Sequence, residues 1–176
     1  MYKLKQQEET PRSGGKRKSA HVHRTRILIA DRFPVVRDGI RHIIDNHPKF
    51  EVIAEAGSGM EAVRKAVESR ADIAILGCAL PLLNGIAATT DIRRRSPKTE
   101  VLIYTMRTNE AAICDALTAG ARGYVLKSDG NHRLHAAIES LSVHRPYFTP
   151  IVSALLLKLI PKGFFNGGPC EVRGPK

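Results

Sequence analysis

The stretch Ala71-Asp72-Ile73-Ala74-Ile75-Leu76-Gly77 places four apolar residues in a row before a glycine. A short apolar run of this kind is typical of a buried parallel strand, because helices cover both of its faces. Similar runs lie at residues 27–30, 52–54, 101–104 and 124–126. Amphipathic helical patterns separate them, so strand and helix alternate five times. This alternation predicts an α/β fold in three layers, with a doubly wound parallel sheet between two layers of helices.

The five predicted helices each carry an apolar stripe or a clear boundary signal. The stripes are Val36, Ile40, Ile43 and Ile44; Ala62, Val63, Ala66 and Val67; Ile113, Ala116 and Leu117; and Leu134, Ala137, Ile138 and Leu141, and the third helix is expected at residues 86–94. Ser58 and Glu61 form a capping box before the second helix. Pro34 suits the first turn of a helix, and Gly120 follows the fourth stripe, where a left-handed residue ends a helix.

The two ends of the chain differ in composition from the middle. Residues 1–24 hold few large apolar side chains and many charges, so we expect a disordered basic arm. Residues 25–145 form the predicted domain. Residues 146–161 are expected to be a linker helix whose seven large apolar side chains need cover from the domain or from a partner. Residues 162–176 are expected to be an irregular tail.

The net charge of +11 is carried mainly by these two ends. Residues 1–26 contribute +6 and residues 162–176 contribute +2, which leaves +3 for the middle of the chain. Because no helix-turn-helix pattern is present either, DNA binding by the predicted domain is not favoured.

The cysteines indicate the compartment. Cys78, Cys114 and Cys170 form no close pair, which favours a reduced, cytoplasmic setting over a disulfide framework or a zinc site. No apolar run approaches the length of about 18 residues that a membrane span needs, so we expect no membrane partner.

Four of the predicted strands end in polar residues or glycines, at the edge of the sheet where α/β proteins carry their chemistry. The strand ends are Asp31-Arg32, Gly77 with the following Pro81 and Asn84-Gly85, Thr105-Met106, and Gly123-Tyr124-Val125-Leu126-Lys127-Ser128. Together these segments closely resemble the receiver domain of NarL/FixJ-type (LuxR-family) two-component response regulators. The resemblance covers roughly residues 25–160, and it is specific because four motifs occur in order at the right strand ends.

This resemblance implies a flavodoxin-like (CheY-like) sheet of five parallel strands in the order 2-1-3-4-5. In that family, two acidic residues after the first strand and an aspartate after the third hold Mg²⁺, and that aspartate accepts a phosphoryl group. Carried over by position, Asp31 matches one of the acidic pair, Thr105 the switch hydroxyl, Tyr124 the aromatic residue that changes rotamer, and Lys127 the phosphate-binding lysine.

Two positions depart from the family pattern. Gly77 stands where the phosphoacceptor aspartate is expected, and glycine has no nucleophile. Arg32 stands where the second acid is expected, which replaces a negative charge by a positive one where a divalent cation would sit. We therefore expect no phosphorylation, no catalytic residue, no metal and no cofactor, and hence no enzyme. Asp72 cannot take over, because it lies at the other end of the third strand.

Two interpretations stay open for most of the retained residues. Lys127 either pairs with Asp31 or contacts an anionic ligand. Thr105 and Tyr124 either keep a switch role or serve only as good strand formers. Arg32 is most simply a cation that pairs with Asp31 and replaces the charge of the metal. Cys78 is expected to be a packing residue. Four histidines are expected on exposed helix faces without ligand roles: His42, His47, His132 and His135.

The sequence thus predicts an atypical (pseudo-) receiver domain that acts in signal transduction and transcription regulation independently of phosphorylation. Its expected partner is a protein: a regulator, a kinase or a second copy of itself in a homodimer. Three alternatives are a ligand- or anion-sensing domain that uses the vacated pocket near Gly77, Arg32 and Lys127, non-specific nucleic-acid binding by the basic N-terminal arm, and a non-functional remnant. A stand-alone receiver, a fragment and a frame-shifted product all fit the chain as given.

Overall fold

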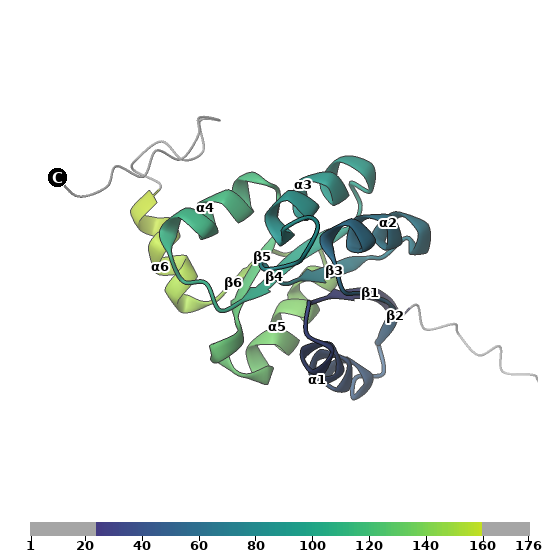
Figure 1. Ribbon diagram of the computed structural model, residues 1–176. Coiled ribbons are helices and arrows are strands. Elements are labelled where there is room, and N and C mark those ends of the chain that lie inside the picture. The colour runs from purple at the N-terminus through teal and green to yellow at the C-terminus, as the bar shows by residue number, and fades with distance from the viewer. Residues whose placement is uncertain (1–23, 160–176) are drawn as a thin grey trace, which may run out of the picture.

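A computed structural model describes residues 24–159 (Figure 1). The expected disordered arm, apart from Arg24, and the expected irregular tail lie outside the described residues. The six strands are β1 (Thr25–Ala30), β2 (Phe50–Ala56), β3 (Ile73–Leu76), β4 (Glu100–Thr105), β5 (Gly123–Leu126) and β6 (Tyr147–Phe148). They form one parallel sheet in the order β2-β1-β3-β4-β5-β6. The predicted order of the first five strands is confirmed.

The sixth strand corrects the prediction of five. It lies at the start of residues 146–161, where the sequence predicted only a linker helix. The backbone N–H of Tyr147 donates to the carbonyl of Arg122 at 3.0 Å, and Tyr147 and Phe148 pair with Gly123 and Tyr124 of β5. A strand of two residues leaves no periodic pattern in a sequence, so only this pairing with β5 identifies it.

Helices cover both faces of the sheet, as predicted (Figure 1). They are α1 (Pro34–Asp45), α2 (Gly59–Ser69), α3 (Gly85–Arg95), α4 (Glu110–Thr118), α5 (Asn131–Ser142) and α6 (Pro150–Leu159), with a 3₁₀ turn at Lys127–Asp129. The helices α1 and α5 cover one face through a cluster that includes Ile40 and Leu134. The helices α2, α3 and α4 cover the other face through a second cluster, which includes Val63 and Ile113.

The predicted helix boundaries agree with the structure in three places. Pro34 is the first residue of α1, and Gly120, with φ of 97°, follows the end of α4. The Ser58 hydroxyl caps α2 by accepting from the backbone N–H of Glu61 at 3.3 Å. The Glu61 carboxylate accepts from the N–H of Gly57 instead of completing the capping box at Ser58.

The α6 helix packs partly on its own domain. Val152 is fully buried, and Leu155 and Leu156 pack against the same cluster as α4. Ile151 and Leu157 remain more than half exposed. The domain therefore buries some of the apolar side chains of α6 and leaves others exposed to solvent or to a partner.

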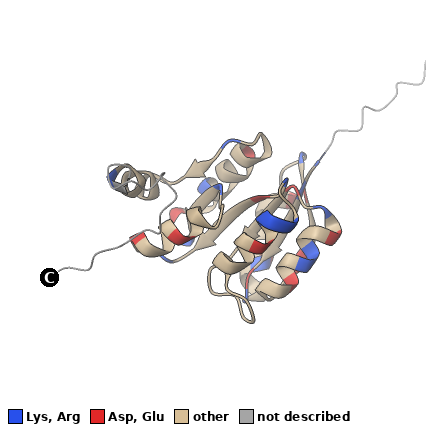
Figure 2. Ribbon diagram, turned by 90° about the horizontal axis from the view of Figure 1, so that it is seen from above, with Lys and Arg blue, Asp and Glu red and all other residues tan. Residues whose placement is uncertain are grey.

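Charges of both signs lie on α1, α2, α3 and α5, whereas α4 carries only acidic residues and α6 carries a single lysine (Figure 2). Among residues 24–159, none of the helices is long and apolar enough to cross a membrane.

Candidate functional site at the carboxyl edge of the sheet

The predicted site residues come together where the strands end. Asp31 directly follows β1, Gly77 directly follows β3 and Lys127 directly follows β5, while Thr105 is the last residue of β4. Because all these strands are parallel, their carboxyl ends meet at one edge of the sheet.

Both carboxylate oxygens of Asp31 accept hydrogen bonds. Oδ1 accepts from the backbone N–H of Phe33 at 2.9 Å, and Oδ2 accepts from Nζ of Lys127 at 2.5 Å. Asp31 is almost fully buried, so this charge-assisted bond is shielded from water. Of the two interpretations of Lys127, the structure shows the pairing with Asp31, which engages one of the three N–H donors of the ammonium group.

Arg32 does not pair with Asp31, so that prediction is wrong. The Arg32 side chain is exposed, and its guanidinium carbon lies 4.8 Å from the centre of the Phe33 ring. Two other cations contact Asp31. Lys127 binds the carboxylate, and Arg37 of α1 donates to the backbone carbonyl of Asp31 at 2.8 Å. The cation that compensates the buried carboxylate is therefore the residue that follows β5 and not the neighbouring residue Arg32.

Gly77 lies directly against Asp31. Its backbone N–H donates to the carbonyl of Ala30 at 2.8 Å, which holds it next to β1. A Cβ atom at this position would lie 2.8 Å from Oδ2 of Asp31. Any side chain here therefore requires the Asp31 carboxylate, and with it Lys127, to move.

The end of β4 is fixed by two hydroxyl groups. The buried Thr105 accepts at Oγ1 from the backbone N–H of Arg107 at 3.2 Å. The fully buried Tyr124 donates its hydroxyl to the carbonyl of Arg107 at 2.9 Å. Burial raises the pKa of Tyr124 well above its ordinary value, so the phenol stays protonated and keeps donating. Both groups thus hold the backbone of one residue in the loop between β4 and α4.

Arg107 was not singled out from the sequence. Its contribution here is a backbone N–H and a carbonyl, which every residue except proline offers, so its identity carried no signal. Only its distance of two residues from Thr105 could have pointed to it.

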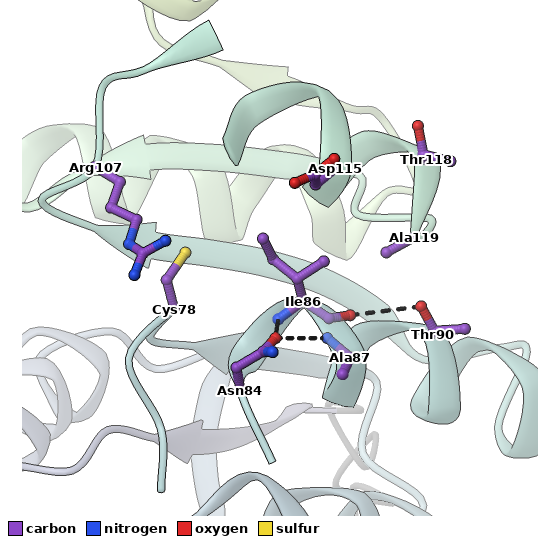
Figure 3. A pocket seen from close by; sticks show the side chains of 9 residues that line it. All are labelled: Cys78, Asn84, Ile86, Ala87, Thr90, Arg107, Asp115, Thr118 and Ala119. Atoms are coloured by element: carbon purple, nitrogen blue, oxygen red, sulfur yellow. Dashed lines mark hydrogen bonds between the residues drawn. The ribbon is translucent and has the colours of Figure 1, made fainter. Parts of the chain in front are cut away.

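A cavity of about 650 Å³ opens beside this site, between α3 and α4 (Figure 3). Its lining residues are Cys78, Asn84, Ile86, Ala87, Thr90, Arg107, Asp115, Thr118 and Ala119. Figure 3 shows the Arg107 side chain pointing toward Cys78. Burial raises the pKa of the Cys78 thiol, against the hydrogen bond with Thr105 and the charges of Arg107 and Lys127, which lower it. A protonated, buried thiol suits the packing role that was expected.

The residues present do not fit Mg²⁺. A magnesium site needs several free oxygen ligands, mostly carboxylates and water. Both carboxylate oxygens of Asp31 already accept from nitrogen donors, and neither Arg32 nor Gly77 has an oxygen in its side chain. Among residues 24–159, the site residues belong to no cluster of His, Cys, Asp or Glu that could hold an ion.

Asp72 lies at the opposite edge of the sheet, as predicted. It immediately precedes β3, and its Oδ2 accepts from the backbone N–H of Arg26 at 2.8 Å. It cannot reach the carboxyl ends of the strands.

The chain matches known proteins over most of the described residues. The family model of the response regulator receiver domain matches residues 27–139. The DNA-binding transcriptional activator DevR/DosR of Mycobacterium tuberculosis is 33% identical over 132 residues, which are 75% of this chain and 61% of that protein. The oxygen regulatory protein NreC of Staphylococcus epidermidis is 37% identical over 117 residues, which are 66% of this chain and 54% of that protein. The chain thus spans little more than half the length of these relatives.

A solved structure is similar over nearly its whole length. It is a two-component response regulator of the LuxR family from Aurantimonas sp., with a TM-score of 0.74 and 35% sequence identity. The match covers 78% of this chain and 99% of that one.

Proposed function

Because this chain belongs to the response regulator receiver domain family of two-component systems, we propose that it is an atypical receiver that transmits its signal without being phosphorylated. It works in the cytoplasm by binding another protein, and it catalyses no reaction. The partner is a regulator, a kinase or a second copy of the chain.

The observation that carries this proposal is the geometry at Gly77. The family's phosphoryl transfer requires a carboxylate nucleophile at this strand end. Glycine offers none, and the space that a side chain would enter is bounded by the Asp31 carboxylate, 2.8 Å from the position of a Cβ atom. A side chain at position 77 would therefore require the Asp31 carboxylate to move.

The neighbouring groups support the same proposal. Lys127, the positional match of the phosphate-binding lysine, is bonded to Asp31. Tyr124, the positional match of the switch aromatic residue, is buried and bonded to the loop after β4. Each group therefore has a hydrogen-bond partner within the domain when no phosphoryl group is bound. The surface around the site then keeps one conformation, which a partner protein can recognise.

The output that we propose is transcription regulation. The relatives include a DNA-binding transcriptional activator and an oxygen regulatory protein. Control of DNA binding would pass through a protein contact of the receiver domain.

Incubation of the full chain with acetyl phosphate and Mg²⁺ tests the proposal. We expect intact-protein mass spectrometry to find no added phosphoryl group, under conditions that label a conventional receiver in parallel. A hydroxylamine-sensitive phosphoryl adduct on this chain would contradict it.

Anion sensing is a second candidate, favoured by the cavity beside Cys78. This cavity lies between α3 and α4, and its lining includes none of Gly77, Arg32 and Lys127. The cationic side chain that reaches it is Arg107 (Figure 3). Inorganic phosphate or sulfate that raises the melting temperature of the chain, but not of Arg107→Ala, would support this function.

A further inference from the structure

Three metal-ligating side chains meet on the face of the domain that α1 and α5 cover. His135 and Glu139 lie one turn apart on α5, and His47 lies in the loop between α1 and β2. One nitrogen or oxygen atom from each of the three lies within 4.8 Å of the others. The sequence prediction placed His47 and His135 on exposed helix faces, whereas both are half-buried and His47 is not in a helix.

The distances are too long for hydrogen bonds and close to those around a shared ion. Nε2 of His47 lies 3.8 Å from Oε1 of Glu139, and Nδ1 of His135 lies 3.7 Å from Oε2 of Glu139. Hydrogen bonds between such atoms span about 2.7–3.2 Å. Ligands of one tetrahedral zinc ion, with bonds of about 2.0–2.1 Å, lie about 3.3 Å apart. The two rings thus face different oxygens of one carboxylate, and a metal ion bound between them would draw the three side chains closer together.

The two rings are held in place before any ion binds. The His47 ring stacks on Phe50, with 4.2 Å between ring centres, and it meets the His135 ring edge-on at 5.0 Å. The α5 helix that carries the other two ligands is anchored by the buried Leu134 and Ile138. Glu139 is about half exposed, so its side chain is free to close on an ion.

The tautomer of His47 bears on the binding mode. Its Nδ1 accepts a long bond, 3.3 Å, from the backbone N–H of Lys49. A metal at Nε2 requires the ring proton to sit on Nδ1, so binding gives up this one weak bond.

We propose that His47, His135 and Glu139 form a binding site for a divalent transition metal of the zinc class, which ties α5 to the loop between α1 and β2. Two imidazoles and one carboxylate favour zinc, nickel, cobalt or copper over Mg²⁺ and Ca²⁺, which prefer oxygen ligands. Because both histidines retain some exposure, water or a ligand from a second molecule completes the coordination. The site lies outside the carboxyl edge of the sheet and does not depend on the proposed signalling function.

Zinc titration of the full chain tests this site. The chain also contains His21, His23 and Cys170 outside the described residues, so a parent variant with His21→Ala, His23→Ala and Cys170→Ser is used throughout. We expect one Zn²⁺ per chain by calorimetry. At a free zinc concentration of about 100 times Kd, the melting temperature should rise by about 5 °C or more.

Single variants identify the ligands. In the parent background, His47→Ala, His135→Gln and Glu139→Gln should each abolish the zinc-dependent rise in melting temperature. His132→Ala is the matched control, because the His132 ring lies against Gly130 at the start of the same helix, and it should keep the full rise. With Co²⁺ as probe, the parent should show visible absorption bands that His135→Gln lacks.

Three results would overturn the proposal. They are the absence of stoichiometric zinc binding by the parent variant, a rise in melting temperature that survives in either histidine variant, and a rise that survives in Glu139→Gln. Melting curves without metal show whether each variant folds. If His47→Ala fails to fold, His135→Gln, which keeps size and polarity, decides the question.

Discussion

Nζ of Lys127 lies 2.5 Å from Oδ2 of Asp31, although the two residues are 96 positions apart in the chain. The pair joins the end of β5 to the end of β1 across the carboxyl edge of the sheet. It also engages the only carboxylate that remains from the three expected in this family.

We predict that this pair stabilises the domain. Lys127→Met should lower the free energy of unfolding by about 1–3 kcal/mol, because the Asp31 carboxylate would stay buried without its charged donor. Combining it with Asp31→Asn should recover part of the loss. Urea unfolding of both single variants and the double variant gives the coupling energy.

The control for this measurement is an exposed pair. The side chains of Arg94 and Asp91 form an ion pair on α3 in which both are more than a third exposed. Arg94→Met should change the free energy of unfolding by no more than about 0.5 kcal/mol. Equal effects of Lys127→Met and Arg94→Met would show that burial adds nothing to the Asp31 pair.

Rebuilding the carboxylate cluster should restore chemistry. Gly77→Asp alone should restore little, because position 32 would still carry an arginine in place of the second acid that holds Mg²⁺ in this family. The double variant Gly77→Asp with Arg32→Asp supplies three carboxylates and should gain slow, Mg²⁺-dependent phosphorylation by acetyl phosphate. Mass spectrometry with hydroxylamine treatment measures it. Phosphorylation of the single variant at the rate of the double variant would show that Arg32 has no influence on the site.

Alkaline pH should destabilise the protein through Tyr124. Burial raises the pKa of this phenol in the folded state, while the unfolded chain ionises near the ordinary value of about 10. The stabilisation is therefore complete below about pH 10, and it is lost as the pH rises through the folded pKa. Urea unfolding at pH 8 to 11 should show this loss.

The Tyr124→Phe variant isolates the effect. At neutral pH it should cost about 1 kcal/mol for the hydroxyl bond to Arg107. Above pH 10 it should lose stability less steeply than the natural chain, although not without slope, because burial also raises the pKa of Tyr104. If the stability of Tyr124→Phe falls with pH as steeply as that of the natural chain, then Tyr124 ionises in the folded protein as it does in the unfolded chain.

Two helical glycines should respond in opposite directions to alanine. A Cβ at Gly85 would lie 2.1 Å from the carbonyl oxygen of Gly77, so Gly85→Ala should destabilise by more than about 2 kcal/mol. A Cβ at Gly39 in the middle of α1 would meet nothing within 4 Å, so Gly39→Ala should stabilise by about 0.5–1 kcal/mol. Thermal unfolding of the two variants checks both signs. If Gly85→Ala leaves the stability unchanged, then the start of α3 is not in tight contact with the backbone after β3.

The exposed side of α6 should mediate self-association. Leu157→Glu changes an exposed side chain and should leave the stability within about 0.5 kcal/mol, while it lowers the association measured by light scattering. Val152→Glu places a charge in the core and should destabilise the domain strongly. A natural chain that is monomeric at high micromolar concentration would exclude this interface.

Much of the fold could be predicted because its signals are local. The apolar run at residues 73–76 matches β3, and Pro34 and Gly120 lie where they bound α1 and α4. The two-residue β6 escaped prediction because it is defined only by its pairing with β5. The cluster of His47, His135 and Glu139 escaped for a related reason: His135 and Glu139 share α5, but His47 meets them only when α5 packs beside the loop after α1.

The sequence by itself determined what chemistry is missing from the carboxyl edge of the sheet. A glycine at position 77 has no nucleophile in any fold, because the reactivity of a side chain is a property of the residue. The tertiary structure decided which cation compensates the buried Asp31. Arg32 is the nearest cation in sequence, yet its side chain is exposed and stacks on Phe33, because consecutive residues leaving a strand point in different directions. Lys127 takes that place since β3, β4 and β5 line up beside β1 and bring a distant strand end to the same edge.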